Sequence, residues 1–266
     1  MKITRFKTLD STNQYLQNLL NEGADIADNI VVTDFQTSGK GQGKNVWQSE
    51  DGKNLLFSIA LDMSFLKAEK QFLLTQMVSV AMINVLKKYL PEESLFIKWP
   101  NDIYFNDKKI AGILIKNEIK GMMMGTSIIG IGLNVNQTSF DENLPNPISM
   151  KMITGEDYDL DELLSAVSYQ LSAISYRLSV NSQQSTANFQ LSVFNFQFST
   201  FNYTNKLYRY KQWASYEHEG AVKEMMIIGY DQFGRLILKE KNDREVVCDL
   251  KEISFIIENG KLKMES

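Results

Sequence analysis

The sequence predicts an α+β fold, in which a mixed and largely antiparallel sheet with flanking helices precedes a small C-terminal β-domain. Residues 110–135 read as two long strands joined by a tight turn, which indicates an antiparallel pair. Two long segments, 65–90 and 159–178, repeat apolar residues at helical spacing. Beyond Tyr203 the pattern changes to short strands broken by turn residues, which is typical of a separate β-domain.

The first sixty residues predict three strands and one helix. Ser11 precedes an apolar pattern at helical spacing, and Gln14 follows three residues later, so we expect a helix that begins with a capping box. Gly23 is expected to end this helix. A loop over 36–52 separates the last two strands. The strands are predicted at 2–9, 29–35 and 54–61.

The segment 65–90 predicts a long helix with one apolar face, which ends before Pro91. Residues 94–99 then form a strand that Pro100 ends, because proline has no N–H for the hydrogen-bond ladder. Two further strands, at 103–105 and 108–115, are expected on either side of an Asn-Asp turn.

The remainder is expected to hold two more helices before the β-domain. Residues 137–158 are loop-rich, and Asp159 with Glu162 predicts a second capping box at the start of the next helix. A further helix is predicted over 185–198. We therefore divide the chain into a large α+β domain, 1–202, and a small β-domain, 203–266.

Composition excludes several classes of function. The chain has 266 residues, with 28 basic and 32 acidic side chains and a net charge of −4, which argues against general nucleic-acid binding. The single histidine, His218, argues against a His-based triad or a zinc site. The single cysteine, Cys248, excludes an intrachain disulfide framework and fits a reducing compartment. Without a membrane segment or signal peptide in the sequence, we expect a soluble cytoplasmic protein.

Residues 98–102 (KWPND) place a cation and a carboxylate around one tight turn, and Lys109 adds a second cation on the next strand. This arrangement suits a site that neutralises anionic substrates. A surface hairpin with ordinary solvated lysines is the alternative interpretation.

The glycine-rich segment 39–44 (GKGQGK) is not a standard phosphate loop. No Gly-Lys-Ser/Thr closes it, and a strand rather than a helix follows it, so it fits neither the Walker nor the dinucleotide-binding pattern. Its glycines with Lys40 and Lys44 could still close as a mobile clamp over a carboxylate and a phosphate. A flexible surface loop is the alternative.

Four motifs, in order and at similar spacing, resemble those of the biotin–protein ligases over roughly residues 1–200. The segments that carry the resemblance are 10–13 (DSTN), 36–42 (QTSGKGQ) with Trp47, 98–102 with 109–114 (KIAGIL), and 130–136 (GIGLNVN). The resemblance implies a catalytic sheet like that of class II aminoacyl-tRNA synthetases and a C-terminal barrel of the Src-homology type.

The same resemblance implies an ATP-dependent, amide-forming ligase. Such an enzyme activates biotin as the acyl-adenylate biotinyl-5′-AMP and transfers the biotinyl group to a lysine of a biotin carboxyl carrier protein or domain. Mg²⁺ is expected with ATP from phosphoryl-transfer chemistry, and no metal ligand is assigned. Exposed strand edges could pair with the acceptor or with a second subunit in a homodimer.

The resemblance implies three overlapping sets of site residues. The catalytic residues are Lys109, Asp102 and Lys40. The biotin-binding residues are Ser11, Thr12, Asn13, Gln36, Gly39, Lys40, Gly41, Lys109, Gly112, Ile113 and Leu133. The ATP-binding residues are Lys40, Gln42, Lys44, Trp47, Asn101, Lys109 and Asn134.

Elementary chemistry supports part of this assignment and leaves some roles open. Ser11 and Gln36 can hydrogen-bond a cyclic urea, although Ser11 also makes a good helix cap. Asp102 can hold Lys109, coordinate magnesium, take a proton from the incoming amine, or simply cap a turn. Trp47 and Ile113 are equally interpretable as core residues, and Asn134 as a residue that ends a strand.

Two departures from the family pattern stand out, and two rival functions remain. Lys40 and Gln42 occupy positions where related ligases often carry arginines, so bidentate phosphate contacts from this loop are in doubt. Lys116 stands where many relatives have an acidic residue. The rivals are a lipoate–protein ligase or related acyl transferase, and a non-enzymatic biotin-sensing regulator. Because only ten residues precede Ser11, we expect no DNA-binding module ahead of it.

Overall fold

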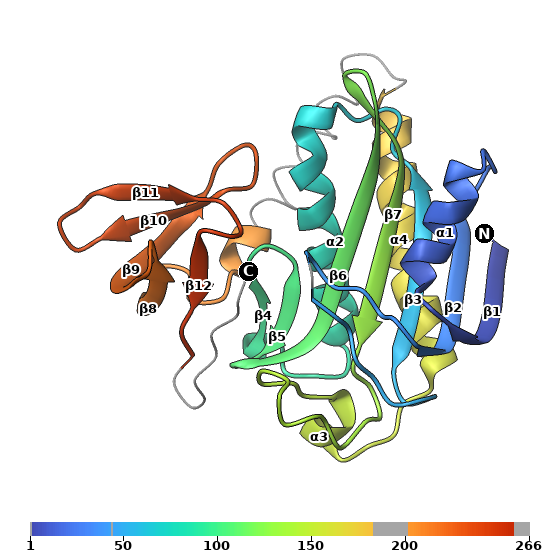
Figure 1. The fold of residues 1–266 in the computed structure, drawn as a ribbon, viewed down its shortest axis with the longest axis horizontal. Coiled ribbons are helices and arrows are strands. Elements are labelled where there is room, and N and C mark those ends of the chain that lie inside the picture. The colour runs from blue at the N-terminus through green and yellow to red at the C-terminus, as the bar shows by residue number, and fades with distance from the viewer. Residues whose placement is uncertain (1, 44, 183–201, 258–266) are drawn as a thin grey trace.

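The computed structural model describes residues 2–43, 45–182 and 202–257, arranged around two sheets (Figure 1). The larger sheet has seven strands in the order β1-β2-β3-β7-β6-β5-β4, and the smaller has five in the order β11-β10-β9-β8-β12. Only the β1–β2 pair is parallel, and every other strand pair is antiparallel. The predicted mixed sheet and C-terminal β-domain are therefore confirmed.

The elements follow the expected order. The strands of the larger sheet are β1 (Lys2–Leu9), β2 (Asn29–Gln36), β3 (Leu55–Asp62), β4 (Leu95–Lys98), β5 (Asp102–Phe105), β6 (Lys108–Lys120) and β7 (Met123–Leu133). Those of the smaller sheet are β8 (Trp213–His218), β9 (Ala221–Tyr230), β10 (Leu236–Glu240), β11 (Glu245–Cys248) and β12 (Ile253–Phe255). The described helices are α1 (Thr12–Asn21), α2 (Gln71–Leu86), α3 (Met150–Thr154) and α4 (Leu160–Ser182), with 3-10 turns at Ala68–Lys70 and Glu92–Ser94.

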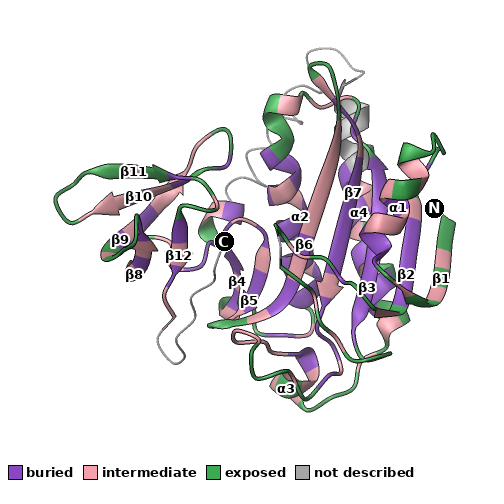
Figure 2. Cartoon of the chain, in the orientation of Figure 1, coloured by how far each residue is buried: buried purple, intermediate pink, exposed green. Residues whose placement is uncertain are grey.

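Alternation along the strands divides the large sheet into two covered faces. Ile30 and Val32 of β2 belong to the main core with α2 and α4, whereas Val31 between them packs with Leu16 of α1. Figure 1 shows α1 in front of the sheet and α4 behind it, and Figure 2 shows the central strands buried between them. The short α1 covers only part of its face, which leaves the rest of that face to other segments.

Both predicted helix caps form, but neither becomes a reciprocal capping box. Ser11 Oγ accepts a hydrogen bond from Gln14 N, while the Gln14 side chain bonds Asn18 and Lys40 instead of returning to the cap. Asp159 caps α4 in the same way, and the Glu162 side chain accepts a hydrogen bond from the Tyr89 hydroxyl instead. The predicted return bonds from the Gln14 and Glu162 side chains to their caps are therefore wrong. Both side chains bond other groups instead, among them Lys40 and Tyr89.

Helix α2 differs most from its prediction. The segment 65–90 begins with a 3-10 turn, and the α-helix covers only Gln71–Leu86. It is buried on nearly every side rather than along one face, since the sheet, α4 and the C-terminal segment all pack against it. The loop-rich stretch 137–158 also contains α3, which was not predicted. The helix predicted over 185–198 lies outside the described residues.

The smaller sheet contacts the β4–β5 edge of the larger one. Leu207 forms a bridge with Ile97 of β4, and buried residues of both sheets belong to one hydrophobic cluster. The boundary placed at 202/203 stays a prediction. None of the described helices combines the length and the apolar character that crossing a membrane requires.

Candidate active site

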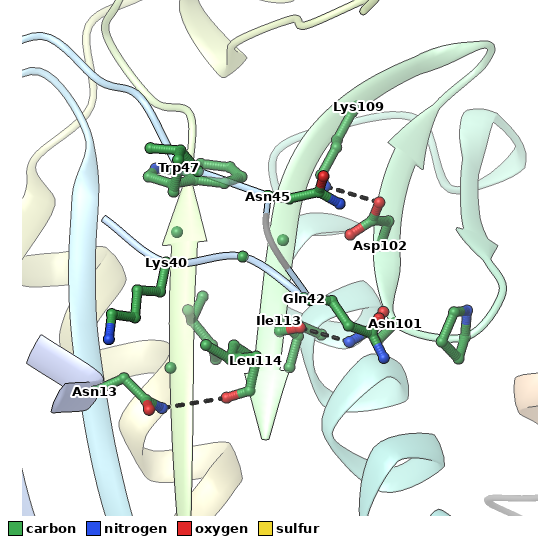
Figure 3. A pocket seen from close by; sticks show the side chains of 18 of the residues that line it. Asn13, Lys40, Gln42, Asn45, Trp47, Asn101, Asp102, Lys109, Ile113 and Leu114 are labelled. Atoms are coloured by element: carbon green, nitrogen blue, oxygen red, sulfur yellow. Dashed lines mark hydrogen bonds and ion pairs between the residues drawn. The ribbon is translucent and has the colours of Figure 1, made fainter. Parts of the chain in front are cut away.

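A cavity of about 310 Å³ opens on the face of the large sheet that α1 leaves uncovered (Figure 3). Its floor contains Gly112 of β6, its register partner Gly132 of β7, and Gly130 of β7, which pairs with Leu114. Because glycines have no side chains, this part of the sheet leaves room for a cavity beside the start of α1. The cavity is walled by the start of α1, the 36–47 loop, the 98–102 turn and part of the C-terminal sheet.

The 98–102 turn brings the predicted catalytic pair together. Asp102 begins β5 and pairs with Gly112, and a register shift after Ile103 places Lys109 opposite Tyr104. In this arrangement Lys109 Nζ lies 2.7 Å from Asp102 Oδ2, and both side chains line the cavity (Figure 3). The Trp99–Pro100 peptide bond is cis.

Asn101 and Lys98 complete this side of the cavity. Asn101 is buried, and its Nδ2 donates to the carbonyl oxygen of Ile113, which fixes the turn on β6. Lys98 is only 5% exposed, and its ammonium group lies over the rings of Tyr104 and Phe255. Burial, reinforced by the charge of Lys109, lowers the pKa of Lys98 to about 8, although Asp102 opposes the shift.

The glycine-rich loop folds back on itself rather than standing free. Lys40 pairs with Val46 in an antiparallel bridge, and the Trp47 N–H donates to the carbonyl of Gly39 at 2.9 Å. Lys40 Nζ donates to Gln14 Oε1 on α1, and Gln42 faces the cavity beside Asn101 (Figure 3). Lys44 lies outside the described residues.

Trp47 lies across the glycine floor. A Cβ added to Gly132 would be 2.4 Å from the indole ring, and one added to Gly112 would be 2.9 Å from it. Lys109 Nζ lies 5.7 Å from the ring centroid, within cation–π range. The indole ring therefore covers the floor at Gly112 and Gly132. The floor at Gly130 lies instead against Asn13 of α1.

That part of the cavity is polar. Thr12 N and Thr12 Oγ1 both donate to Gln36 Oε1, at 2.8 and 3.2 Å, and Thr12 Oγ1 is 2.8 Å from Ser58 Oγ. Asn13 is 3% exposed, and its Nδ2 makes only a long contact of 3.5 Å with the Leu114 carbonyl. No group among the described residues pairs with Asn13 Oδ1. An unpaired, buried oxygen beside a cavity is a ready acceptor for a ligand N–H.

Most of the predicted site residues meet at this cavity. Those that line it are Ser11, Thr12, Asn13, Gln36, Lys40, Gly41, Gln42, Trp47, Asn101, Asp102, Lys109, Gly112 and Ile113. Gly39 lies behind the lining, against the backbone of Trp47. Leu133 is fully buried in the core, and Asn134 anchors strands through bonds to Ile110 and Ile148. These three residues are not part of the described cavity wall.

Several lining residues were not predicted. Lys98 belongs to the 98–102 motif but was not predicted as a site residue. Its burial, which the sequence does not show, places its charge in the cavity wall. Ser58 and Asn45 have no sequence signal that separates them from ordinary strand and loop residues. Residues 250–255 come from the C-terminal domain, and only tertiary contact brings them to the wall.

The described residues contain no group of three or more His, Cys, Asp or Glu side chains that could hold a metal ion. Asp102 is the carboxylate of the cavity wall, and it faces Lys109. One carboxylate is compatible with a magnesium ion that takes most of its ligands from a nucleotide and water. Mg²⁺ therefore stays a prediction.

Sequence comparison identifies relatives over part of the chain. The Biotin/lipoate A/B protein ligase family matches residues 5–134. The bifunctional ligase/repressor BirA of Bacillus subtilis is 34% identical over 154 residues, which are 57% of this chain and 46% of that protein. Biotin–protein ligase 1 of Arabidopsis thaliana, a chloroplast protein, is 38% identical over 109 residues, 40% of this chain and 29% of its own. The chain therefore spans about half the length of the Bacillus protein and less than a third of the Arabidopsis protein.

Structural comparison extends over nearly the whole chain. The biotin protein ligase of Aquifex aeolicus, solved in complex with biotin and ATP, superposes with a TM-score of 0.73. The match covers 96% of this chain and 99% of that one, at 23% sequence identity. At this identity the similarity establishes a common fold, including the C-terminal β-domain.

Proposed function

Because residues 5–134 belong to the Biotin/lipoate A/B protein ligase family, we propose that this chain is a biotin–protein ligase. It joins biotin to ATP as biotinyl-5′-AMP and then transfers the biotinyl group to a lysine of a biotin carboxyl carrier domain. The observation that carries the proposal is the division of the cavity into an unpaired polar end at Asn13 and a cationic end at Lys109 and Lys98.

The polar end suits the ureido ring of biotin. A cyclic urea has two N–H donors and a carbonyl acceptor, and Asn13 Oδ1 offers a buried acceptor for one N–H. Because Gln36 Oε1 already accepts from Thr12, its amide nitrogen is left to donate toward the ligand. A plain aliphatic tail, as in the lipoate alternative, would leave Asn13 unpaired at a cost of roughly 1–3 kcal/mol.

The cationic end suits the first chemical step. A carboxylate oxygen of biotin attacks the α-phosphorus of ATP, and pyrophosphate leaves with the electrons of the broken P–O bond. Two anions must approach each other, so a cation beside both lowers the barrier. Lys109, held by Asp102 at 2.7 Å, neutralises the biotin carboxylate and the α-phosphate, while Lys98 and Lys40 add positive charge on either side.

The second step requires no nucleophile from the enzyme. The acceptor lysine attacks the carbonyl carbon of the mixed anhydride, AMP leaves, and the new amide nitrogen loses a proton. Only the neutral amine is nucleophilic, and its ordinary pKa is about 10.4, so the ammonium form must lose a further proton before it attacks. Asp102 can accept it when Lys109 turns to the leaving phosphate.

The test is the intact mass of a biotin carboxyl carrier domain after incubation with this chain, ATP, Mg²⁺ and either biotin or lipoate. We expect one biotinyl group per carrier domain with biotin, and none when the acceptor lysine is replaced by arginine. Modification with lipoate but not with biotin would assign the chain to the lipoate branch of the family. Absence of both products would refute ligation to this acceptor.

A separate assay isolates the first step. Biotin-dependent exchange of labelled pyrophosphate into ATP needs no acceptor, so it reports adenylate formation alone. Exchange without transfer would retain the activation step and reject the carrier domain as the acceptor. Biotin binding without exchange would favour a biotin-sensing regulator.

A further inference from the structure

Two hydrogen bonds join the C-terminal part of the chain to the 98–102 turn. Trp99 Nε1 donates to the carbonyl oxygen of Gly234, in the β9–β10 hairpin, at 2.8 Å. The Tyr203 hydroxyl donates to the carbonyl oxygen of Pro100 at 2.7 Å. Both bonds join groups more than one hundred residues apart in sequence, immediately before the ion pair of Asp102 with Lys109.

The groups that make these bonds are held tightly. Tyr203 is fully buried, and its ring packs edge-on against Phe72 of α2 and Tyr230 of β9. Gly234 has a φ of +87°, and a Cβ there would lie 2.3 Å from the Phe72 ring. The hairpin can therefore approach Trp99 only with glycine at this position. Phe255 of β12 adds a third contact, beneath the ammonium group of Lys98.

We propose that Tyr203 and Gly234 are positioning residues, through which the C-terminal β-domain holds the 98–102 turn so that Asp102 presents Lys109 to the substrates. The turn follows only four strand residues in β4, at an edge of the large sheet, and within that sheet the Asn101 side chain bonds it to Ile113 of β6. The bond to the Pro100 carbonyl and the bond to the Trp99 side chain supply two fixed points. A small displacement of a catalytic group costs rate far more than it costs binding.

The chain offers a matched pair of variants. Tyr203→Phe removes the hydroxyl that bonds Pro100 and keeps the ring on Phe72. Tyr230→Phe removes a hydroxyl of the same aromatic cluster that lies 3.1 Å from Thr204 Oγ1. Gly234→Ala is a third variant that displaces the hairpin without altering any residue of the cavity wall.

The first measurement is amide hydrogen exchange of the full-length variants, followed in peptides that contain residues 98–103. We expect exchange in this segment to rise roughly tenfold in Tyr203→Phe, and exchange to remain at the wild-type rate in Tyr230→Phe. Equal exchange in the two variants would overturn the proposal, because the turn would then be held without the C-terminal domain. This readout does not depend on the chemistry that the protein performs.

The second measurement rests on the proposed function. In biotin-dependent pyrophosphate exchange, Tyr203→Phe should lower kcat at least about tenfold while the KM for biotin changes less than about twofold. Tyr230→Phe should change neither, and Gly234→Ala should follow Tyr203→Phe. A looser turn with an unchanged kcat would overturn the proposal. If the wild-type chain forms no adenylate, the proposed function fails, and hydrogen exchange alone decides whether Tyr203 holds the turn.

Discussion

The indole ring of Trp47 lies on Gly132 so closely that a Cβ on Gly132 would be 2.4 Å from Trp47 Cε2. Gly112, the register neighbour of Gly132 on β6, leaves the same space on the adjacent strand. The two glycines therefore form a slot that receives the ring. The slot also brings the ring within 5.7 Å of Lys109 Nζ, at the cationic end of the cavity.

Gly132→Ala should displace Trp47 from this slot. We expect the KM for ATP to rise at least about tenfold, because Trp47, a predicted ATP-binding residue, no longer lies flat on the floor, whereas biotin affinity changes little. The measurement is steady-state pyrophosphate exchange with titration of each substrate. In a Trp47→Ala background the same glycine substitution should have almost no further effect. An equal effect in both backgrounds would show that Gly132 acts without Trp47.

Removal of the Lys109 ammonium group should abolish adenylate formation. We expect Lys109→Ala to reduce the rate of pyrophosphate exchange at least about 100-fold, because two anions then meet without a cation between them. Asp102→Asn distinguishes the roles left open for the carboxylate. If Asp102 only orients Lys109, both half-reactions should slow together. If it takes the amine proton, transfer from preformed biotinyl-5′-AMP should slow more than activation does, which single-turnover assays measure.

Replacement of Asn13 should raise the stability of the fold and lower the affinity for biotin. Asn13→Leu removes a buried oxygen that has no partner among the described residues, so the free energy of unfolding in urea should rise by roughly 1 kcal/mol. Biotin affinity should fall at least about tenfold, since a ureido N–H loses its acceptor. Asn101→Leu is the control, because Asn101 is satisfied by Ile113 and its loss should destabilise the fold. Unchanged biotin affinity in Asn13→Leu would contradict the assigned polar end.

The pKa of Lys98 predicts an alkaline limb in the activity profile. Burial lowers this pKa to about 8, so the free enzyme loses the charge of Lys98 as the pH rises through that value. We expect kcat/KM for ATP to be highest below about pH 8 and to decline above it. Lys98→Arg keeps its charge throughout this range, so its profile should lack the decline. An identical limb in wild type and variant would assign it to another group.

The same shift predicts an opposite trend in stability. Because the folded pKa of Lys98 lies below its ordinary value of 10.5, the unfolded chain binds more protons than the folded one between about pH 8 and 10.5. The contribution of Lys98 to the free energy of unfolding therefore increases with pH across that window. Urea unfolding of wild type and Lys98→Met at several pH values measures this contribution as the difference between the two.

The sequence determined the local elements and part of the cavity wall. Turn residues bounded the strands, Ser11 and Asp159 marked the starts of two helices, and proline marked the end of β4, because each of these signals depends on nearby backbone groups. The ordered motifs likewise identified Lys109, Asp102 and the start of α1 as parts of one site, and the structure brings them to one cavity.

Tertiary structure decided what depends on distant partners. The Gln14 side chain bonds Lys40 across a loop rather than its own helix cap, and α2 is buried all round because three separate elements cover it. Burial sets the pKa of Lys98, and packing on Phe72 brings Gly234 to Trp99. No local pattern encodes such contacts, since their energy appears only when segments far apart in the chain exclude water together.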